Sequence, residues 1–222
     1  MRRAGPDPSP GTPERGALLV VDVQYDFASP EHVARFGEDA LRRVEAAVDR
    51  VHTLVAAARS HGVPVLWARL EQDPADPWWS SRWLRGLLDA DAGDLREREP
   101  CVAGTQGADW YGPGPGGGEE VVVKRRYSAF HGTGLAGSLR ARGTEWVAVC
   151  GLTTDCCVDA TVRDAFQEGL RTVVAGDATA SYSEQRHRHT LDVLGLHAAV
   201  VTDTGTLSRA WAGARRGTQH GR

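Results

Sequence analysis

The sequence contains almost no lysine and almost no methionine. Lys124 is the single lysine and Met1 the single methionine, so all but one of the 26 basic residues are arginine. Lysine is a compact charge that releases its proton readily when buried, whereas arginine does not. A chain that uses arginine nearly everywhere for positive charge therefore marks Lys124 as a position where arginine does not serve, and a site that needs this group to exchange a proton would exclude arginine.

Long apolar runs and a basic excess are also missing. No segment approaches the roughly 20 apolar residues that cross a bilayer, and residues 1–16 carry no apolar stretch of the kind found in a secretory signal. The net charge of -3 gives no reason to expect nucleic acid or an anionic membrane as a partner. We expect a cytoplasmic protein whose partner is a small-molecule substrate, with no nucleic acid and no membrane.

Cysteine is too scarce for a disulfide framework. The chain has four cysteines in 222 residues, and two of them, Cys156 and Cys157, are adjacent and would be strained if bridged. Reduced thiols are therefore expected. Cys150 lies inside an apolar run and is expected in the core, while Cys101 has no assigned role.

Apolar periodicity predicts an alternating α/β chain. Continuous apolar runs predict buried strands at 17–22, 63–68, 121–124, 146–151, 172–177 and 198–202. Spacings of three and four predict helices at 38–61, 133–143, 156–169 and 184–195. Strands that alternate with helices form right-handed crossovers, so we predict a Rossmann-like, three-layer α-β-α fold around a six-stranded parallel sheet.

The domain boundaries follow from the same pattern. A single domain is expected at 16–211, between a disordered N-terminal tail at 1–15 and a loose Gly/Arg-rich tail at 212–222. Residues 69–120 are the least regular part and are expected as a long excursion with short helices over the sheet edge. Long structured loops in compact domains are usually functional.

Chemically notable residues follow three of the predicted strands. They are Asp22, Lys124 and the Cys156–Cys157 pair. Ligands of parallel α/β sheets bind beyond the carboxyl ends of the strands. The start of the next helix is expected to lower the thiol pKa of Cys157. A thiol nucleophile also needs a base and gains from a nearby ammonium group, which Asp22 and Lys124 provide.

Three motifs in this order resemble one family. ALLVVDVQYDF (17–27), VVVKRRYSAFHGT (121–133) and GLTTDCCVDATVRDAFQEGLRTVVAGDATAS (151–181) are similar to the isochorismatase-like cysteine hydrolases. The resemblance covers about 17–205 and implies the isochorismatase-type fold. It also implies a homodimer or homotetramer.

The resemblance assigns roles to individual residues. Asp22 matches the family's catalytic aspartate, which acts as acid and base. Lys124 matches the catalytic lysine, which stabilises charge, and Cys157 matches the nucleophile. It also implies a cis peptide bond before Thr153. The backbone N–H groups of Thr153 and Cys157 are implied to form the oxyanion hole.

Departures from the family patterns narrow the expected activity. The segment WARLEQDPADPWW (67–79) has no histidine, and none occurs between His61 and His131, so the metal site of the nicotinamidases is missing. We expect no metal and no cofactor. GTQGADW (104–110) is similar to the amidohydrolase branch that includes ureidoacrylate and N-carbamoylsarcosine amidases. The expected reaction is therefore hydrolysis of a C–N bond in a small amide, ureido or carbamoyl compound through a thioester.

Alternatives to that reaction remain open. Vinyl-ether isochorismatases lack the cysteine, yet KRRYSAFH (124–131) also resembles their branch, so an ether hydrolase using Asp22 as general acid stays possible. A non-catalytic binding member of the fold is the second alternative. A redox protein using the vicinal Cys156 and Cys157 is the third.

The substrate pocket is expected from aromatic residues near the motifs. The predicted pocket residues are Phe27, Tyr127, Phe130 and His131. Trp78, Trp79 and Trp83 have the spacing of a helix face and are expected either in the pocket or against a neighbouring subunit. Candidates for a substrate carboxylate clamp are Arg69, Arg82, Arg85, Arg125 and Arg126.

Overall fold

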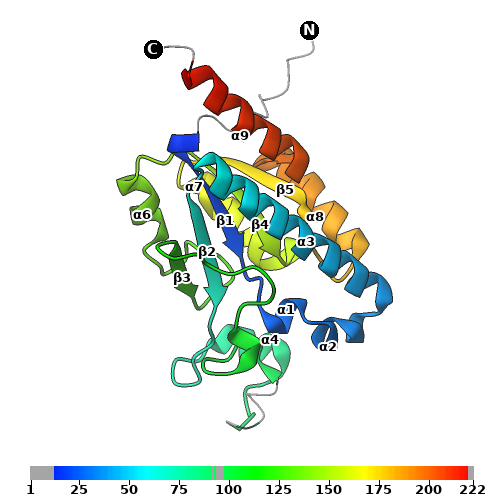
Figure 1. The fold of residues 1–222 in the computed structure, drawn as a ribbon. Helices are drawn as coiled ribbons and strands as arrows, with labels where there is room; N and C mark the ends of the chain where they lie inside the picture. The colour runs from blue at the N-terminus through cyan, green and yellow to red at the C-terminus, as the bar shows by residue number, and fades with distance from the viewer. Residues whose placement is uncertain (1–12, 92, 94–97, 220–222) are drawn as a thin grey trace.

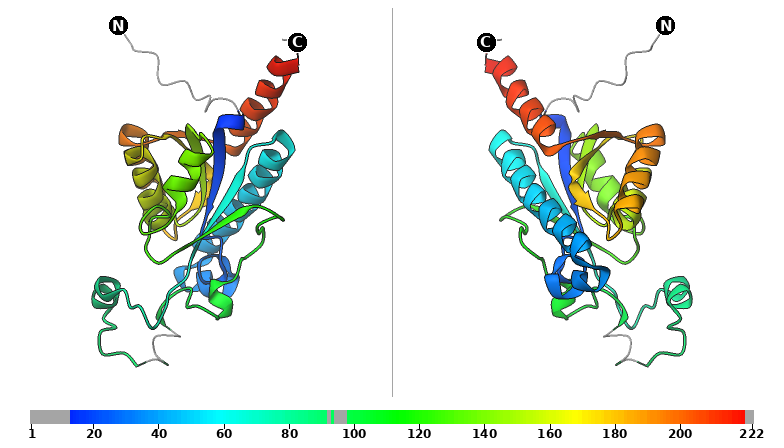
Figure 2. Two further views of the ribbon diagram at one scale, coloured as in Figure 1. Left: turned by 90° about the vertical axis from the view of Figure 1, so that its left-hand side faces the viewer. Right: turned by 90° about the vertical axis from the view of Figure 1, so that its right-hand side faces the viewer.

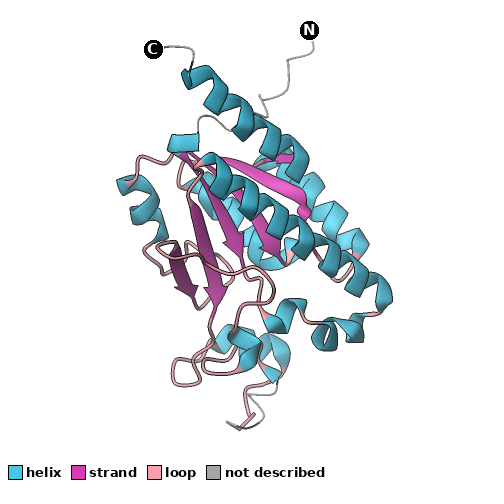
Figure 3. Ribbon diagram, viewed as in Figure 1, coloured by secondary structure: helices cyan, strands magenta, loops and turns pink. Residues whose placement is uncertain are grey.

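The protein is built around one parallel sheet. The computed structural model describes residues 13–91, 93 and 98–219. Within these ranges, six strands occur in the spatial order β3-β2-β1-β4-β5-β6, and every neighbouring pair is parallel (Figures 1 and 3). They are β1 (Gly16–Val21), β2 (Val65–Leu70), β3 (Glu120–Lys124), β4 (Trp146–Leu152), β5 (Arg171–Ala180) and β6 (Val200–Thr202). The predicted six-stranded parallel α/β fold is confirmed.

Helices cover both faces of the sheet. Helices α3 and α9 pack on one face, and α6, α7 and α8 pack on the other, which gives three layers (Figure 2). Their bounds are α3 (Glu38–His61), α6 (Leu135–Ala141), α7 (Asp159–Gln167), α8 (Glu184–His197) and α9 (Thr204–Gln219). In the part of the chain that the structure describes, no helix is long and apolar enough to span a membrane.

The central strand shows why the apolar runs are continuous. Successive strand side chains point to opposite faces. Leu18 and Val20 of β1 accordingly join the core under α3 and α9, while Leu19 and Val21 join the core under α6, α7 and α8. All four are at most 1% exposed. A strand buried on both faces has no polar positions in its interior, so an unbroken apolar run is what it requires.

The short elements gather beyond the carboxyl ends of the strands. The excursion between β2 and β3 lies there beside the segment that follows β1 (Figure 1). These elements are α1 (Tyr25–Ala28), α2 (Pro30–Val33), η2 (Ala34–Phe36), α4 (Trp79–Arg85) and η3 (Gln106–Ala108). An isolated bridge from Gln24 to Trp110 joins the excursion to the segment after β1, and a bridge from Gln72 to Val102 joins two parts of the excursion. The excursion therefore forms a wall around the edge where the predicted catalytic residues lie.

Both predicted tails are shorter in the structure than in the sequence interpretation. Helix α9 continues to Gln219, so residues 212–219 are helical rather than loose. The helix is held by Trp211, which is fully buried and stacks on Trp146 at a ring-centroid distance of 6.4 Å. At the other end, Pro13–Arg15 form the 3-10 turn η1, and the Arg15 carbonyl accepts a hydrogen bond from the Glu145 N–H. The remaining tail positions, 1–12 and 220–222, lie outside the described residues.

Gly151 is required where β4 passes β1 near the site. Its φ is +111°, and a Cβ there would lie 2.0 Å from the backbone oxygen of Val21. Gly151→Ala is therefore expected to reduce the free energy of unfolding by about 3 kcal/mol or more, because backbone strain and overpacking add. Denaturant titration measures this.

Gly137 offers the matched control for Gly151. It lies in α6, and a Cβ at that position would meet nothing within 4 Å. Gly137→Ala is expected to raise the free energy of unfolding by about 0.5–1 kcal/mol through helix propensity. Equal unfolding midpoints for the two variants would contradict the close approach at Gly151.

Candidate active site

The sheet order brings the three predicted catalytic residues together. Asp22 follows β1 at the centre of the sheet, Lys124 ends β3, and Cys157 follows β4. Strand β4 is the direct neighbour of β1, whereas β2 separates β3 from β1. Since neighbouring strands lie about 4.8 Å apart, Lys124 has to reach across the end of β2 to meet Asp22. A long side chain is therefore needed at the end of β3.

Lys124 and Asp22 form a buried ion pair. Lys124 Nζ lies 2.6 Å from Asp22 Oδ2, and both side chains are 0% exposed. Nζ also donates a hydrogen bond to the carbonyl oxygen of Arg126 at 3.1 Å. Asp22 itself has a positive φ of 49°, an uncommon conformation for a residue other than glycine. Residues in such conformations cluster at functional sites.

Cys157 lies in a tight turn between β4 and α7. The turn is the π-helical segment η4 (Thr154–Val158), in which the Val158 N–H donates to the Thr153 carbonyl at 3.2 Å. Segments of this kind occur frequently at functional sites. The peptide bond between Leu152 and Thr153 is cis, as the family resemblance implies. Cys157 is 4% exposed and packs in the core cluster beneath α6, α7 and α8.

Side chains of helix α8 and strand β5 hold the turn that carries Cys157. The buried Thr154 hydroxyl lies 2.9 Å from His187 Nδ1 and 2.9 Å from the Thr179 hydroxyl. On the outside of the turn, Arg186 Nε pairs with Asp155 at 2.8 Å. The backbone that carries Cys157 is therefore held by side chains of both β5 and α8. Thr154 and His187 were not predicted as partners, because they lie far apart in the chain and share no local pattern.

The protonation states follow from burial and from the close charges. Burial raises the pKa of the Asp22 carboxyl, although Lys124 opposes the rise. Burial alone lowers the pKa of Lys124, but Asp22 and Cys157 outweigh it, so the pKa is raised and the ammonium group stays charged. This environment favours a constant charge on Lys124 over proton exchange, in line with the role of charge stabiliser that the family resemblance implies.

The pKa of the Cys157 thiol also differs from the prediction, which was that the helix start would lower it. Its contact with Cys156 and its burial raise its pKa well above the ordinary value, against a smaller lowering by Lys124. The helix start expected to lower this pKa is farther along the chain, because α7 begins only at Asp159. The resting thiol is therefore protonated, and an adjacent base is needed to generate the nucleophile. Asp22, with its raised pKa, is a stronger base than an ordinary aspartate.

Two further residues of the first motif organise the site. The Gln24 side chain is fully buried and exchanges hydrogen bonds with the backbone of Leu70, and it donates to the Ala108 carbonyl at 2.8 Å. Asp26 Oδ2 accepts the Cys101 N–H at 2.6 Å. Both residues tie the excursion to the end of β1. No role was predicted for either residue, although the spacing Asp-x-Gln-x-Asp places both of them just after the catalytic Asp22.

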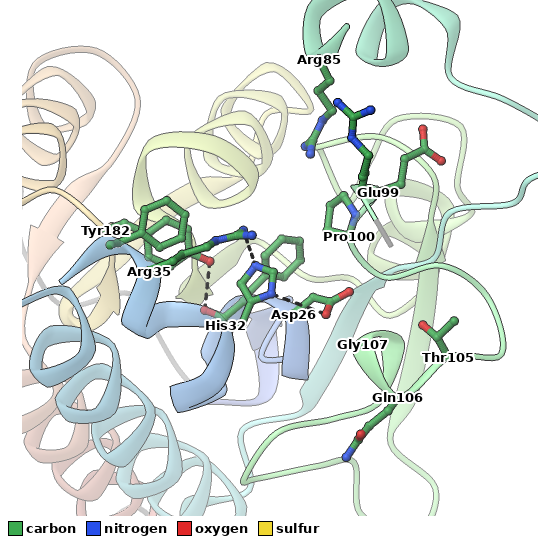
Figure 4. A pocket seen from close by; sticks show the side chains of 13 residues that line it. Asp26, His32, Arg35, Arg85, Glu99, Pro100, Thr105, Gln106, Gly107 and Tyr182 are labelled. Atoms are coloured by element: carbon green, nitrogen blue, oxygen red, sulfur yellow. Dashed lines mark hydrogen bonds and ion pairs between the residues drawn. The ribbon is translucent and has the colours of Figure 1, made fainter. Parts of the chain in front are cut away.

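A polar cavity of about 770 Å³ opens at this edge of the sheet (Figure 4). Its wall includes Asp26 and Phe27 from α1, Arg35 and Phe36 from η2, Arg85 from α4, residues 98–100 and 105–107 from the excursion, and Tyr182. Tyr182 follows the end of β5 and donates a hydrogen bond to the Phe27 carbonyl at 3.0 Å. Cavities of roughly 300–1,000 Å³ are typical of small-molecule sites.

The predicted pocket residues occupy different places around this edge. Phe27 lines the cavity. Phe130 is buried in the same core cluster as Cys157, and Tyr127 packs against that cluster. His131 is exposed to solvent. The pocket roles of Tyr127, Phe130 and His131 stay predictions.

One of the five candidate arginines faces the cavity. Arg85 lines it, whereas Arg69 pairs with Glu71, Arg82 with Glu99, Arg125 with Asp73, and Arg126 lies over the Trp78 ring. Arg35 and Arg98, which also line the cavity, were not among the candidates. They come from segments with no motif of their own, so nothing local in the sequence marked them.

The tryptophan cluster divides between interior and surface. Trp78 packs edge-to-face on Tyr127 with the ring centroids 4.6 Å apart. Trp79 and Trp83 on α4 are 61% and 68% exposed. Trp78 thus supports the wall near the site, and the two exposed rings stay candidates for contact with a neighbouring subunit. Among the described residues, no group of three or more His, Cys, Asp or Glu side chains is arranged to hold a metal ion.

Comparisons with known proteins agree with the fold and the motifs. Residues 16–206 match the family described as the isochorismatase domain. A ureidoacrylate amidohydrolase from Methylobacterium radiotolerans is 33% identical over 95% of this chain and 88% of its own length. Nicotinamidase 3 from Arabidopsis thaliana is 30% identical over 89% of each chain. A cysteine hydrolase from Pseudomonas syringae superposes with a TM-score of 0.77 and 25% identity, over 92% of this chain and 96% of that one.

These matches define the class of the protein. The sheet order and the helical layers are those of a three-layer α/β protein with a candidate site at the carboxyl edge of its sheet. The chain belongs to the isochorismatase family, because the family match spans most of its length. It is an isochorismatase-family hydrolase, and the resemblance predicted from its three motifs is confirmed.

Proposed function

We propose that this enzyme is a cysteine hydrolase that cleaves a C–N bond of a small amide, ureido or carbamoyl compound through a covalent thioester. The observation that carries the proposal is the fully buried Lys124–Asp22 ion pair, 2.6 Å long, beside the buried Cys157 thiol. A carboxylate base, a fixed ammonium group and a thiol are the parts that nucleophilic acyl transfer needs. The names of both curated relatives describe hydrolysis of C–N bonds other than peptide bonds.

The first half of the reaction forms the thioester. Asp22 accepts the Cys157 thiol proton, and the sulfur attacks the carbonyl carbon, whose C=O electrons move to oxygen. The backbone N–H groups of Thr153 and Cys157 stabilise this oxyanion, a contribution of about 3 kcal/mol for each donor. The tetrahedral intermediate collapses and the C–N bond breaks. Asp22 returns the proton to the leaving nitrogen, which departs as ammonia or an amine.

The second half restores the enzyme. Asp22 takes a proton from a water molecule, whose oxygen adds to the thioester carbonyl. The C–S bond then breaks, the acid product leaves, and Asp22 returns its proton to the Cys157 sulfur. Lys124 stays charged throughout and stabilises the negative charge that moves between carboxylate, thiolate and oxyanion. The raised pKa of Lys124 favours this constant charge.

A substrate panel with trapping tests the proposal. Small ureido, carbamoyl and primary amide compounds are screened for ammonia release, together with one isochorismate-type enol ether. We expect ammonia from at least one C–N compound. In acid-quenched turnover mixtures, peptide fragmentation should assign an acyl mass increment to Cys157 and not to the adjacent Cys156. Ether hydrolysis without any C–N cleavage, or C–N cleavage with the adduct on Cys156, would contradict the proposal.

A further inference from the structure

A single buried hydroxyl connects the turn that carries Cys157 to the elements behind it. Thr154, the first residue of η4, is 0% exposed. Its hydroxyl lies 2.9 Å from the Thr179 hydroxyl and 2.9 Å from His187 Nδ1. Thr179 belongs to β5 and His187 to α8 (Figure 1). One side chain of the turn is therefore bonded to two elements that are separate in the sequence.

The hydrogen bonds within the turn fix its own shape. The Cys156 N–H and the Val158 N–H both donate to the carbonyl of Thr153, at 3.1 and 3.2 Å. These bonds hold the residues of the turn relative to Thr153, but they do not hold the turn relative to the sheet. The Thr154 hydroxyl supplies that link, because Thr179 is in the part of β5 that pairs with β4.

The turn carries both the nucleophile and the proposed oxyanion donors. Thr153 directly precedes Thr154, and Cys157 follows it three residues later. An oxyanion donor acts over only about 2.7–3.1 Å, so its position relative to the attacked carbonyl has to be exact. A misplacement of about 1 Å can lower a rate by about 10²-fold. The position of this turn is therefore expected to decide the rate of the chemical step.

The ring of His187 contributes a hydrogen bond and not a charge. It is half-buried, and burial lowers its pKa against the opposite effect of Glu184, so the ring is neutral. The ring also lines a hollow of about 190 Å³ between α3, β5 and α8, which leaves room for a longer side chain. A side-chain amide can replace the bond of a neutral ring nitrogen. The amide of asparagine reaches the place of Nδ1, whereas that of glutamine reaches the place of Nε2.

We propose that His187 is a positioning residue of this hydrolase. Through the Thr154 hydroxyl it holds the Thr153 N–H and the Cys157 sulfur in the arrangement that attack on the carbonyl requires. His187 acts on the turn and not on the bound substrate, so its loss lowers kcat and leaves KM nearly unchanged. The proposal rests on the C–N hydrolase reaction proposed above and extends the parts that this reaction needs to α8.

The test compares His187→Asn with His187→Gln on a C–N substrate that releases ammonia. His187→Gln is expected to lower kcat about 10- to 100-fold while KM stays within about 3-fold, and His187→Asn should keep both within about 3-fold. Thr154→Val should show the same loss as His187→Gln. The double variant should lose no more than either single variant, because both changes remove the same hydrogen bond. Melting temperatures show that each variant is folded.

A second measurement does not depend on turnover. In the Cys156→Ala protein, Cys157 is the one thiol left in η4, and peptide mass spectrometry follows its alkylation by iodoacetamide. Cys157 is 4% exposed, so a turn released from α8 should expose its sulfur more often. In this background, His187→Gln is expected to speed the alkylation about 3-fold or more, and His187→Asn should leave it within about 2-fold.

His189→Gln provides the matched control. His189 is an exposed histidine on the same helix, and its replacement should change neither kcat nor the alkylation of Cys157. Equal kcat values for His187→Asn and His187→Gln, or additive losses in the double variant, would overturn the positioning role. Faster alkylation in His187→Gln alone, without C–N turnover by any of the proteins, would support the positioning role and refute the hydrolase reaction instead.

Discussion

Cys157→Ala is expected to lower kcat/KM for the C–N substrate by at least about 10⁴-fold, the scale on which enzymes lose a covalent nucleophile. Neither charged neighbour of this thiol can take the role of the sulfur. Asp22 is paired with Lys124 and serves as the base. Lys124 remains charged, so its nitrogen has no free electron pair with which to attack. The residual rate would come from substrate positioning and the oxyanion donors alone. Steady-state kinetics with purified protein measure the loss, and the melting temperature shows that the fold is kept.

The neighbouring thiol supplies the control. Cys156 directly precedes Cys157 in the same π-helical turn and is half-buried. Cys156→Ala should keep kcat/KM within about 5-fold, since it removes no reacting atom. Because Cys156 raises the pKa of Cys157, its loss should also lower that pKa. Full turnover by Cys157→Ala would instead favour ether hydrolysis with Asp22 as the acid, and loss of activity in Cys156→Ala alone would move the nucleophile to Cys156.

The elements predicted well are those whose sequence pattern reflects burial. Helix α3 was expected at 38–61 and runs from Glu38 to His61, because its apolar spacing matches one buried face and Gly62 ends it. The strands agree within a few residues, since a sheet covered on both sides requires apolar runs. Helix α9 (Thr204–Gln219) was not predicted, and its residues from 212 on were expected to be loose because they are rich in Gly and Arg. The middle of α9 is anchored by the Trp211–Trp146 stack, a contact between residues far apart in the sequence.

In the candidate site, too, one part could be predicted from the sequence and another could not. Asp22, Lys124 and Cys157 were predictable as neighbours, because the carboxyl ends of parallel strands share one edge of the sheet. The cavity was not predictable in detail. Its wall combines Arg35, Arg85 and Tyr182, which become neighbours only when the irregular excursion folds against the segment after β1. No periodic pattern specifies that packing, so which arginine lines the cavity could not be read from the sequence.

The single lysine of the chain is the site of the second large expected effect on kcat/KM. Lys124→Arg preserves the charge, yet we expect kcat/KM to fall by at least about 10²-fold, the scale of losing one well-placed electrostatic group. Proton exchange was the first reason to expect this, but the raised pKa of Lys124 keeps the ammonium group charged. The reason that the structure supports is size and shape. The side chain is 0% exposed, and Nζ fits between Asp22 Oδ2 at 2.6 Å and the Arg126 carbonyl at 3.1 Å. A planar guanidinium group is larger and would displace Asp22 from the thiol.

Two companion variants separate shape from charge at this position. Lys124→Met keeps a long side chain and removes the charge that lowers the Asp22 pKa, so the acid limb of its kcat/KM profile should move to higher pH. Lys124→Arg keeps the charge, and its acid limb should stay near that of the wild type while the rate falls at all pH values. The reverse exchange on the exposed face of α6, Arg140→Lys, should change kcat/KM by less than about 2-fold, because exposed ion pairs contribute little. Near-normal turnover by Lys124→Arg in a stably folded protein would show that the site accepts either cation. The single lysine in this arginine-rich chain would then be a matter of composition, not of catalysis.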